Sequence, residues 1–182
     1  MPSGATDVSG QPSARRAHPS QLQQWKTVRI EASPLYLDTS ALAKIYAHEP
    51  DSDALDAALS GRRDLLISDL AVTELTSALA RRVREGQVAA AAGRRIYNQL
   101  LRDVRAGEYR LLDLTSATHR EAERLLLTLS RQTPLRAADS LHLAAAALAD
   151  ARALVTYDRQ LHAAALALGT FEVVPAALAP NW

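Results

Sequence analysis

The segment Leu35-Tyr36-Leu37-Asp38-Thr39-Ser40 decides the fold that this sequence predicts. A short apolar run of this kind is typical of a buried strand in a parallel sheet. Thr39 or Ser40 can cap a helix that follows directly. Asp38 stands between strand and helix, where a buried carboxylate is unfavourable unless a proton, a base or a metal ion compensates its charge. The segment therefore predicts an α/β fold with a functional acid at the end of its first strand.

The same alternation of apolar runs and helical patterns continues along the chain to Val174. After the strand at 35–37, further strands are expected at 65–68, 110–114, 153–156 and 171–174. Helices are expected from 39 to before Pro50, and over 51–61, 69–85, 88–106, 115–129, 136–150 and 159–168. Asp69 and Thr115 are expected to cap the starts of their helices, and Gly169 the end of the last one. Such alternation predicts a three-layer α/β/α domain with a central parallel sheet of four to five strands.

Four carboxylates stand where these patterns lead us to expect apolar side chains: Asp38, Glu74, Asp139 and Asp158. Asp38 and Asp158 each follow a strand, so they meet if the first and fourth strands are neighbours in the sheet. Glu74 and Asp139 come from helices and have apolar residues four positions before and after them, which predicts that both face inward. Oxygen ligands in this number suit Mg²⁺, or alternatively Mn²⁺.

A local structural role is the alternative for most of these acids. Asp38 and Asp158 follow strands and could cap the helices after them, and Asp139 could be an acid of a first helical turn, where the helix dipole favours negative charge. Glu74 lies too far inside its helix for any capping role. The four positions support one another as a single site.

The order of four motifs resembles the PIN-domain ribonucleases, and most closely the VapC-type toxins of type II toxin-antitoxin systems. The resemblance covers roughly Ser33 to Pro175. It rests on the opening 36–42 (YLDTSAL), the helical Glu74, the block 138–146 (ADSLHLAAA) and the closing 155–161 (VTYDRQL). It implies a PIN-like domain whose first and fourth strands are neighbours.

The resemblance also implies a Mg²⁺-dependent endoribonuclease that cleaves RNA with metal-activated water. Asp38 and Asp139 are then the expected direct ligands, with Glu74 and Asp158 completing the site through water or a second ion. The implied partners are an RNA substrate and a cognate antitoxin protein. A homodimer is expected through the helices between Asp69 and Ala106.

Several nearby polar residues have two readings each. Ser40 and Thr156 could support a ligand carboxylate or cap the local backbone. Arg136 and Arg159 could hold RNA phosphates or remain solvated surface groups. His142, three residues after Asp139, could orient a phosphate, but a packed histidine is the simpler reading.

Two other functions compete with the nuclease. A haloacid-dehalogenase-like phosphatase would use Asp38 as its nucleophile, but such enzymes have a second aspartate two residues later, where this chain has Ser40. A catalytically inactive PIN-fold binding module would not need all four acids, and this chain keeps them.

The composition limits the number of domains, the class of protein and the cellular location that are possible. The 182 residues suffice for one domain, and the net charge of +1 argues against a broadly basic nucleic-acid-binding protein. Arginine outnumbers lysine, which occurs only as Lys26 and Lys44; codon bias or phosphate contacts would each explain it. Without cysteine the chain has no disulfide or zinc-thiolate site. The sequence shows no membrane-spanning run and no secretory signal, so a cytoplasmic location is expected.

The domain boundaries follow from composition. Residues 1–32 are rich in Ser, Pro, Gly, Gln and Arg and lack a sustained period, which predicts a flexible N-terminal extension. Residues 33–176 form the expected PIN-like domain, and residues 177–182 a C-terminal tail.

Overall fold

The computed structural model describes residues 34–47, 52–129, 131–175 and 178. The five strands within these ranges are β1 (Leu35–Leu37), β2 (Leu65–Ser68), β3 (Arg110–Leu112), β4 (Ala153–Val155) and β5 (Glu172–Val174). The seven helices there are α2 (Thr39–Ala47), α3 (Ser52–Leu59), α4 (Asp69–Arg84), α5 (Ala90–Arg105), α6 (Ser116–Leu129), α7 (Ala137–Leu148) and α8 (Arg159–Leu168). None of these helices is long and apolar enough to cross a membrane. The extension expected over residues 1–32 lies outside the described residues, as does the expected tail apart from Leu178.

The strands form one parallel sheet in the order β3-β2-β1-β4-β5, which confirms the predicted architecture. Leu35 of β1 is paired with Leu65 of β2 on one side and with Ala153 of β4 on the other. The chain builds outward from β1 in one direction and then from β4 in the other, so the strand order reverses between these two strands. Ligands of open α/β sheets collect at such a reversal, beyond the carboxyl ends of the strands.

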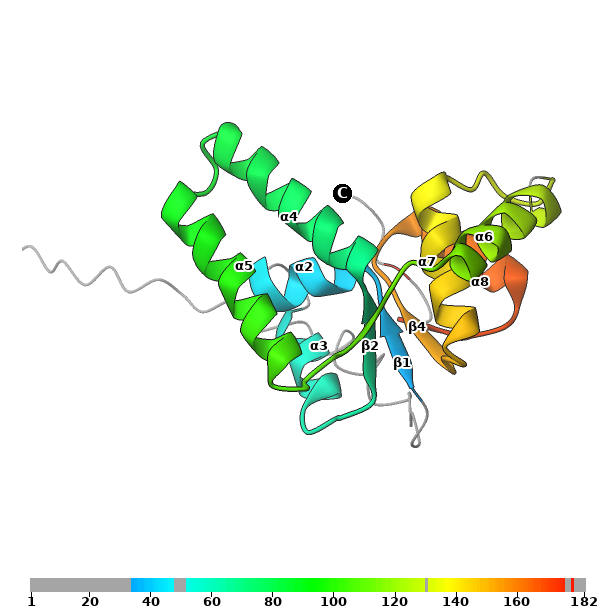
Figure 1. The fold of residues 1–182 in the computed structure, drawn as a ribbon, viewed down its shortest axis with the longest axis horizontal. Coiled ribbons are helices and arrows are strands. Elements are labelled where there is room, and N and C mark those ends of the chain that lie inside the picture. The colour runs from blue at the N-terminus through cyan, green and yellow to red at the C-terminus, as the bar shows by residue number, and fades with distance from the viewer. Residues whose placement is uncertain (1–33, 48–51, 130, 176–177, 179–182) are drawn as a thin grey trace, which may run out of the picture.

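Alternate residues of the central strands are buried in two separate cores. In Figure 1, α2, α3, α4 and α5 lie on one side of the sheet and α6, α7 and α8 lie on the other. Leu35 and Leu37 are fully buried in the core that α2, α3, α4 and α5 cover. Tyr36 points to the opposite core, beneath α6, α7 and α8. Because successive side chains of a strand point to opposite faces, a strand without polar alternation is buried on both.

Two helix caps precede the residues that were predicted. The cap of α4 is Ser68, whose hydroxyl accepts from Ala71 N at 3.3 Å, while the expected cap Asp69 is the first helical residue and accepts from Leu114 N. At the start of α2, Asp38 itself accepts from Ala41 N at 2.9 Å, so neither Thr39 nor Ser40 is the cap. The capping residue precedes the first helical residue. The caps expected from Thr115 and Gly169 are confirmed.

Helices α4 and α5 form an antiparallel pair that projects from the sheet (Figure 1). The turn between them contains Gly86, whose φ of +72° favours glycine. Further along, Gly93 of α5 lies so close to α4 that a Cβ there would stand 3.2 Å from Val83 Cγ2. The sequence predicts this pair, although α5 begins at Ala90 and not at Val88.

Candidate active site

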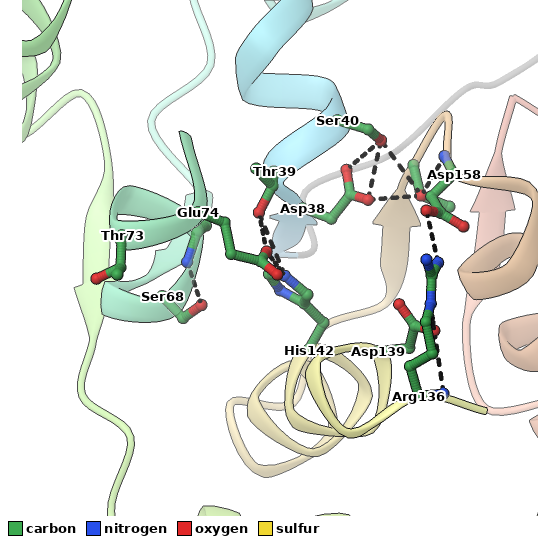
Figure 2. Close-up of polar contacts among 12 residues, drawn as sticks. Asp38, Thr39, Ser40, Ser68, Thr73, Glu74, Arg136, Asp139, His142 and Asp158 are labelled. Carbon is green, nitrogen blue, oxygen red and sulfur yellow. Dashed lines mark hydrogen bonds and ion pairs between the residues drawn. The ribbon is translucent and has the colours of Figure 1, made fainter. Parts of the chain in front are cut away.

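The four carboxylates singled out from the sequence line one pocket of about 660 Å³ beyond the carboxyl ends of β1 and β4. Asp38 lies between β1 and α2, Glu74 on α4, Asp139 in the first turn of α7, and Asp158 at the start of α8. Figure 2 shows Asp38 between Glu74 on one side and Asp158 on the other. Three layers of the fold therefore contribute acids to a single concave surface.

Asp38 is the most buried of these acids, with 2% of its surface exposed. Its carboxylate accepts hydrogen bonds from Ser40 Oγ, Ala41 N and Thr156 Oγ1 at 2.7 to 2.9 Å. Within the described part of the chain no basic side chain forms an ion pair with it. Burial raises the pKa of Asp38, and the nearby His142 and these hydrogen bonds oppose that rise only in part. Asp38 is a fixed, buried acid whose charge a cation would compensate.

Ser40 and Thr156 link Asp38 to the chain after β4. Ser40 Oγ donates to Asp38 and accepts from Tyr157 N at 2.7 Å. Thr156 Oγ1 donates to Asp38 at 2.7 Å and accepts from Asp158 N at 3.0 Å. Each hydroxyl thus holds the carboxylate and one backbone N–H group together. Ser40 and Thr156 therefore support the Asp38 carboxylate and cap the local backbone at the same time.

Arg136 bridges the two late acids (Figure 2). Its Nε donates to Asp139 at 2.9 Å and its Nη2 donates to Asp158 at 2.9 Å. Asp158 also caps α8 by accepting from Gln160 N and Leu161 N. Burial raises the pKa of Asp158, but these N–H groups and Arg136 outweigh it, so the pKa lies below its ordinary value. Arg159, in contrast, is exposed and does not line the pocket.

Glu74 is held by groups from two other elements. It accepts from Thr39 Oγ1 of α2 and from His142 Nε2 of α7, the latter at 2.9 Å. The bond from His142 lowers the pKa of Glu74 most; burial acts against it, and Thr39 adds to the lowering. His142 is 3% exposed, so the reading of a packed histidine holds, and both of its ring nitrogens have partners.

Three arginines of the last turn of α4 line the same pocket: Arg81, Arg82 and Arg84. The sequence reasoning missed them as site residues. The signal available was their spacing, since arginines at 81 and 84 lie on one face of a helix that also carries Glu74. Together with Arg136 they give the acidic pocket a basic margin.

The donor set fits a hard divalent ion in kind, because all four acids supply carboxylate oxygens. The spacing of these side chains does not match a site for a single ion in this conformation. Among the described residues, no three His, Asp or Glu side chains are grouped closely enough to hold one metal ion. Glu74 is paired with His142, and Asp139 and Asp158 are paired with Arg136, so side-chain partners compensate the charges of these three acids in this conformation.

Comparisons with known proteins agree on one family. Residues 35–166 match the model of the PIN domain. The chain is 36% identical to ribonuclease VapC46 of Mycobacterium tuberculosis over 78% of its length and 97% of that protein. Among solved structures it resembles VapC20 of M. tuberculosis, a sarcin-ricin loop cleaving toxin, with a TM-score of 0.58 and 18% identity over 76% of this chain and 98% of that one. It also resembles FitAcB from Neisseria gonorrhoeae, with a TM-score of 0.57 and 18% identity over 79% of this chain and 99% of that one.

Proposed function

The chain belongs to the PIN domain family, and on that premise we propose that it is a Mg²⁺-dependent endoribonuclease acting as the toxin of a toxin-antitoxin pair. The observation that carries the proposal is Asp38, a buried carboxylate without a basic partner in the described residues, in a pocket with three further acids. Burial of such a group as an anion is costly, and a bound cation would offset that cost.

Asp38 and Asp139 would hold the metal ion directly, with Glu74 and Asp158 completing the site through water or a second ion. When bound, a divalent ion acidifies water and offsets the charge that builds up on the oxygens around phosphorus. Ser40 and Thr156 keep Asp38 oriented toward the pocket. Thr39 and His142 hydrogen-bond the Glu74 carboxylate. Mn²⁺, which accepts the same ligands, would substitute for Mg²⁺.

RNA would approach this acidic pocket across its arginines. A pocket lined by four acids repels a polyanion unless nearby cations offset its field. Arg81, Arg84 and Arg136 line the pocket, and a guanidinium binds phosphate oxygens in a fork geometry. We assign the phosphate contacts to these three side chains and none to Arg159.

The remaining partners follow from the family. A cognate antitoxin would cover the pocket and block access of RNA. Two copies of the chain would associate through α4 and α5, the helical pair that projects from the sheet (Figure 1).

The two rival functions have less support. The hydroxyl of Ser40, at the position of the second aspartate of a haloacid-dehalogenase-like phosphatase, is engaged in holding Asp38. An inactive PIN-fold module would have no need of a buried, uncompensated Asp38 and three further acids in one pocket.

The purified protein should cleave a structured RNA with Mg²⁺ or Mn²⁺ and stop when excess chelator is added. Asp38→Asn should abolish cleavage, because it removes a metal ligand. Asp113→Asn is the matched control, since Asp113 is exposed and does not line the pocket. Undiminished cleavage in chelator, or by Asp38→Asn, would refute the metal-dependent nuclease.

A further inference from the structure

Behind Glu74 lies a buried chain of hydrogen bonds that reaches the opposite core. His142 Nε2 is 2.9 Å from Glu74 Oε2, and His142 Nδ1 is 2.7 Å from the hydroxyl of Tyr36. The same hydroxyl also lies 2.7 Å from Ser68 Oγ. Figure 2 shows Glu74 and Thr39 converging with the ring of His142. Tyr36, Ser68 and His142 are each 3% exposed or less.

Each member of this chain is fixed by its own element. Tyr36 belongs to β1, Ser68 ends β2 and caps α4, and His142 lies in the middle of α7. The Tyr36 and His142 rings also meet edge to face, with centroids 5.8 Å apart. The imidazole is therefore held at both nitrogens and along one edge, and it cannot rotate without leaving a buried polar atom unpaired.

Glu74 is held in place by donors from two other elements. Its side chain is 33% exposed, and its two hydrogen-bond donors are Thr39 and His142. An ionised carboxylate only accepts hydrogen bonds, so His142 Nε2 carries a proton directed at Glu74. Groups behind a metal-binding carboxylate that orient it in this way usually change metal affinity by about 10-fold to 100-fold when removed.

We propose that His142, backed by Tyr36, is a positioning residue that holds the Glu74 carboxylate toward the divalent ion and so sets the protein's metal affinity. The proposal rests on the proposed function, in which Glu74 contributes to the metal site. It differs from a plain packing role, because packing alone would not couple His142 to Glu74.

The test compares two amide replacements of similar size at His142. Glutamine places its amide nitrogen near the position of Nε2 and keeps a donor to Glu74, whereas asparagine places its polar end near Nδ1 and faces Tyr36 only. Both leave a buried polar group, so both should lower the melting temperature in chelator. Mn²⁺ affinity, measured by titration calorimetry on the full chain, should fall about 10-fold in His142→Asn and much less in His142→Gln.

A double-mutant cycle with Glu74→Gln supplies the second readout. If His142 acts through Glu74, His142→Asn should weaken Mn²⁺ binding in the parent background and add nothing once Glu74 is replaced. Tyr36→Phe, which removes only the hydroxyl, should give a smaller loss in the same direction.

The possible results distinguish a failure of the positioning role from a failure of the proposed function. A parent protein that neither binds Mn²⁺ nor cleaves RNA would overturn the proposed function. A parent that does both, with His142→Asn binding Mn²⁺ as tightly as the parent, would overturn the positioning role alone. Equal losses in His142→Asn and His142→Gln, or additive losses with Glu74→Gln, would likewise assign His142 to packing.

Discussion

At Asp38 a structural role and a proposed functional role coincide in one side chain. Its carboxylate caps α2 through Ala41 N and also faces the pocket with the other three acids. The sequence reasoning treated these two readings as alternatives, because capping is a property of a local segment. A carboxylate has several lone pairs, so accepting one backbone hydrogen bond leaves others for a ligand.

Neutralising Asp38 should leave the metal-free protein at least as stable as the parent. Burial raises the pKa of Asp38, so between its ordinary and its raised value the folded state retains a proton that the unfolded chain releases. Unfolding free energy therefore falls as pH rises through that window, so above the ordinary pKa of an aspartate this buried acid lowers stability. Asp38→Asn removes this charge. Thermal melts in chelator at pH 7 should place the variant at or above the parent.

Adding metal should raise the melting temperature of the parent more than that of Asp38→Asn. A ligand that binds only the native state raises its melting temperature by mass action, so Mn²⁺ should stabilise the parent more than Asp38→Asn. A variant that melts far below the parent in chelator would instead show that Asp38 is chiefly a structural acid.

Arg136 should prove to be a competitor of the metal and a contact for RNA at once. Its guanidinium bridges Asp139 and Asp158, the charges that the ion would otherwise engage. Arg136→Gln should therefore bind Mn²⁺ more tightly and RNA more weakly. Calorimetry and RNA-binding titrations measure the two effects separately, with Arg159→Gln as the exposed control outside the pocket. Weaker Mn²⁺ binding would mean that Arg136 orients Asp139 and does not compete for it.

At the scale of elements, the strands and helices follow closely from sequence periodicity, and their ends do not. The prediction places the caps of α2 and α4 too late in the chain because Ser, Thr and Asp are neighbours there and all can cap. Only the backbone conformation decides: Ser68 has the extended φ and ψ of a cap, and Asp69 is already helical. The inward face of Asp139 was readable from its row of apolar neighbours, whereas Glu74 lies half-buried at the pocket wall.

The contact between α4 and α5 should depend on Gly93. A Cβ added at this position would stand 3.2 Å from Val83 Cγ2, so a large side chain must push the helices apart. Gly93→Leu should lower the free energy of unfolding by about 1–3 kcal/mol despite its better helix propensity. Ala91→Leu on the exposed side of the same helix should change it by no more than about 0.5 kcal/mol. Chemical denaturation of both variants gives the comparison; equal stabilities would show that the two helices separate freely.

The complete site could be recognised only when the arrangement of the strands was known. The four acids were recognisable one by one, but their meeting depends on β1 and β4 being neighbours, which hydrophobic periodicity does not encode. Tyr36 and His142 are 106 residues apart, and each looks like an ordinary core residue of its own segment. The arginines of α4 were hidden in the same way, because a basic last turn is common in helices.

The charge distribution of the whole molecule leads to a prediction about RNA binding. The net charge is only +1, so attraction to RNA must come from the few arginines at the pocket and not from a broad basic surface. Each phosphate of a single strand that is neutralised contributes about −0.7 to the slope of log K against log salt concentration. Contacts from Arg81, Arg84 and Arg136 therefore predict a slope of about −2.

RNA titrations should use Asp38→Asn with Mg²⁺, so that the RNA stays intact. Replacing Arg81 and Arg84 together by glutamine should reduce the slope to about −0.7. A slope steeper than about −4 for Asp38→Asn with its arginines intact would require more phosphate contacts than the pocket offers, and would place the main RNA-binding surface elsewhere on the molecule.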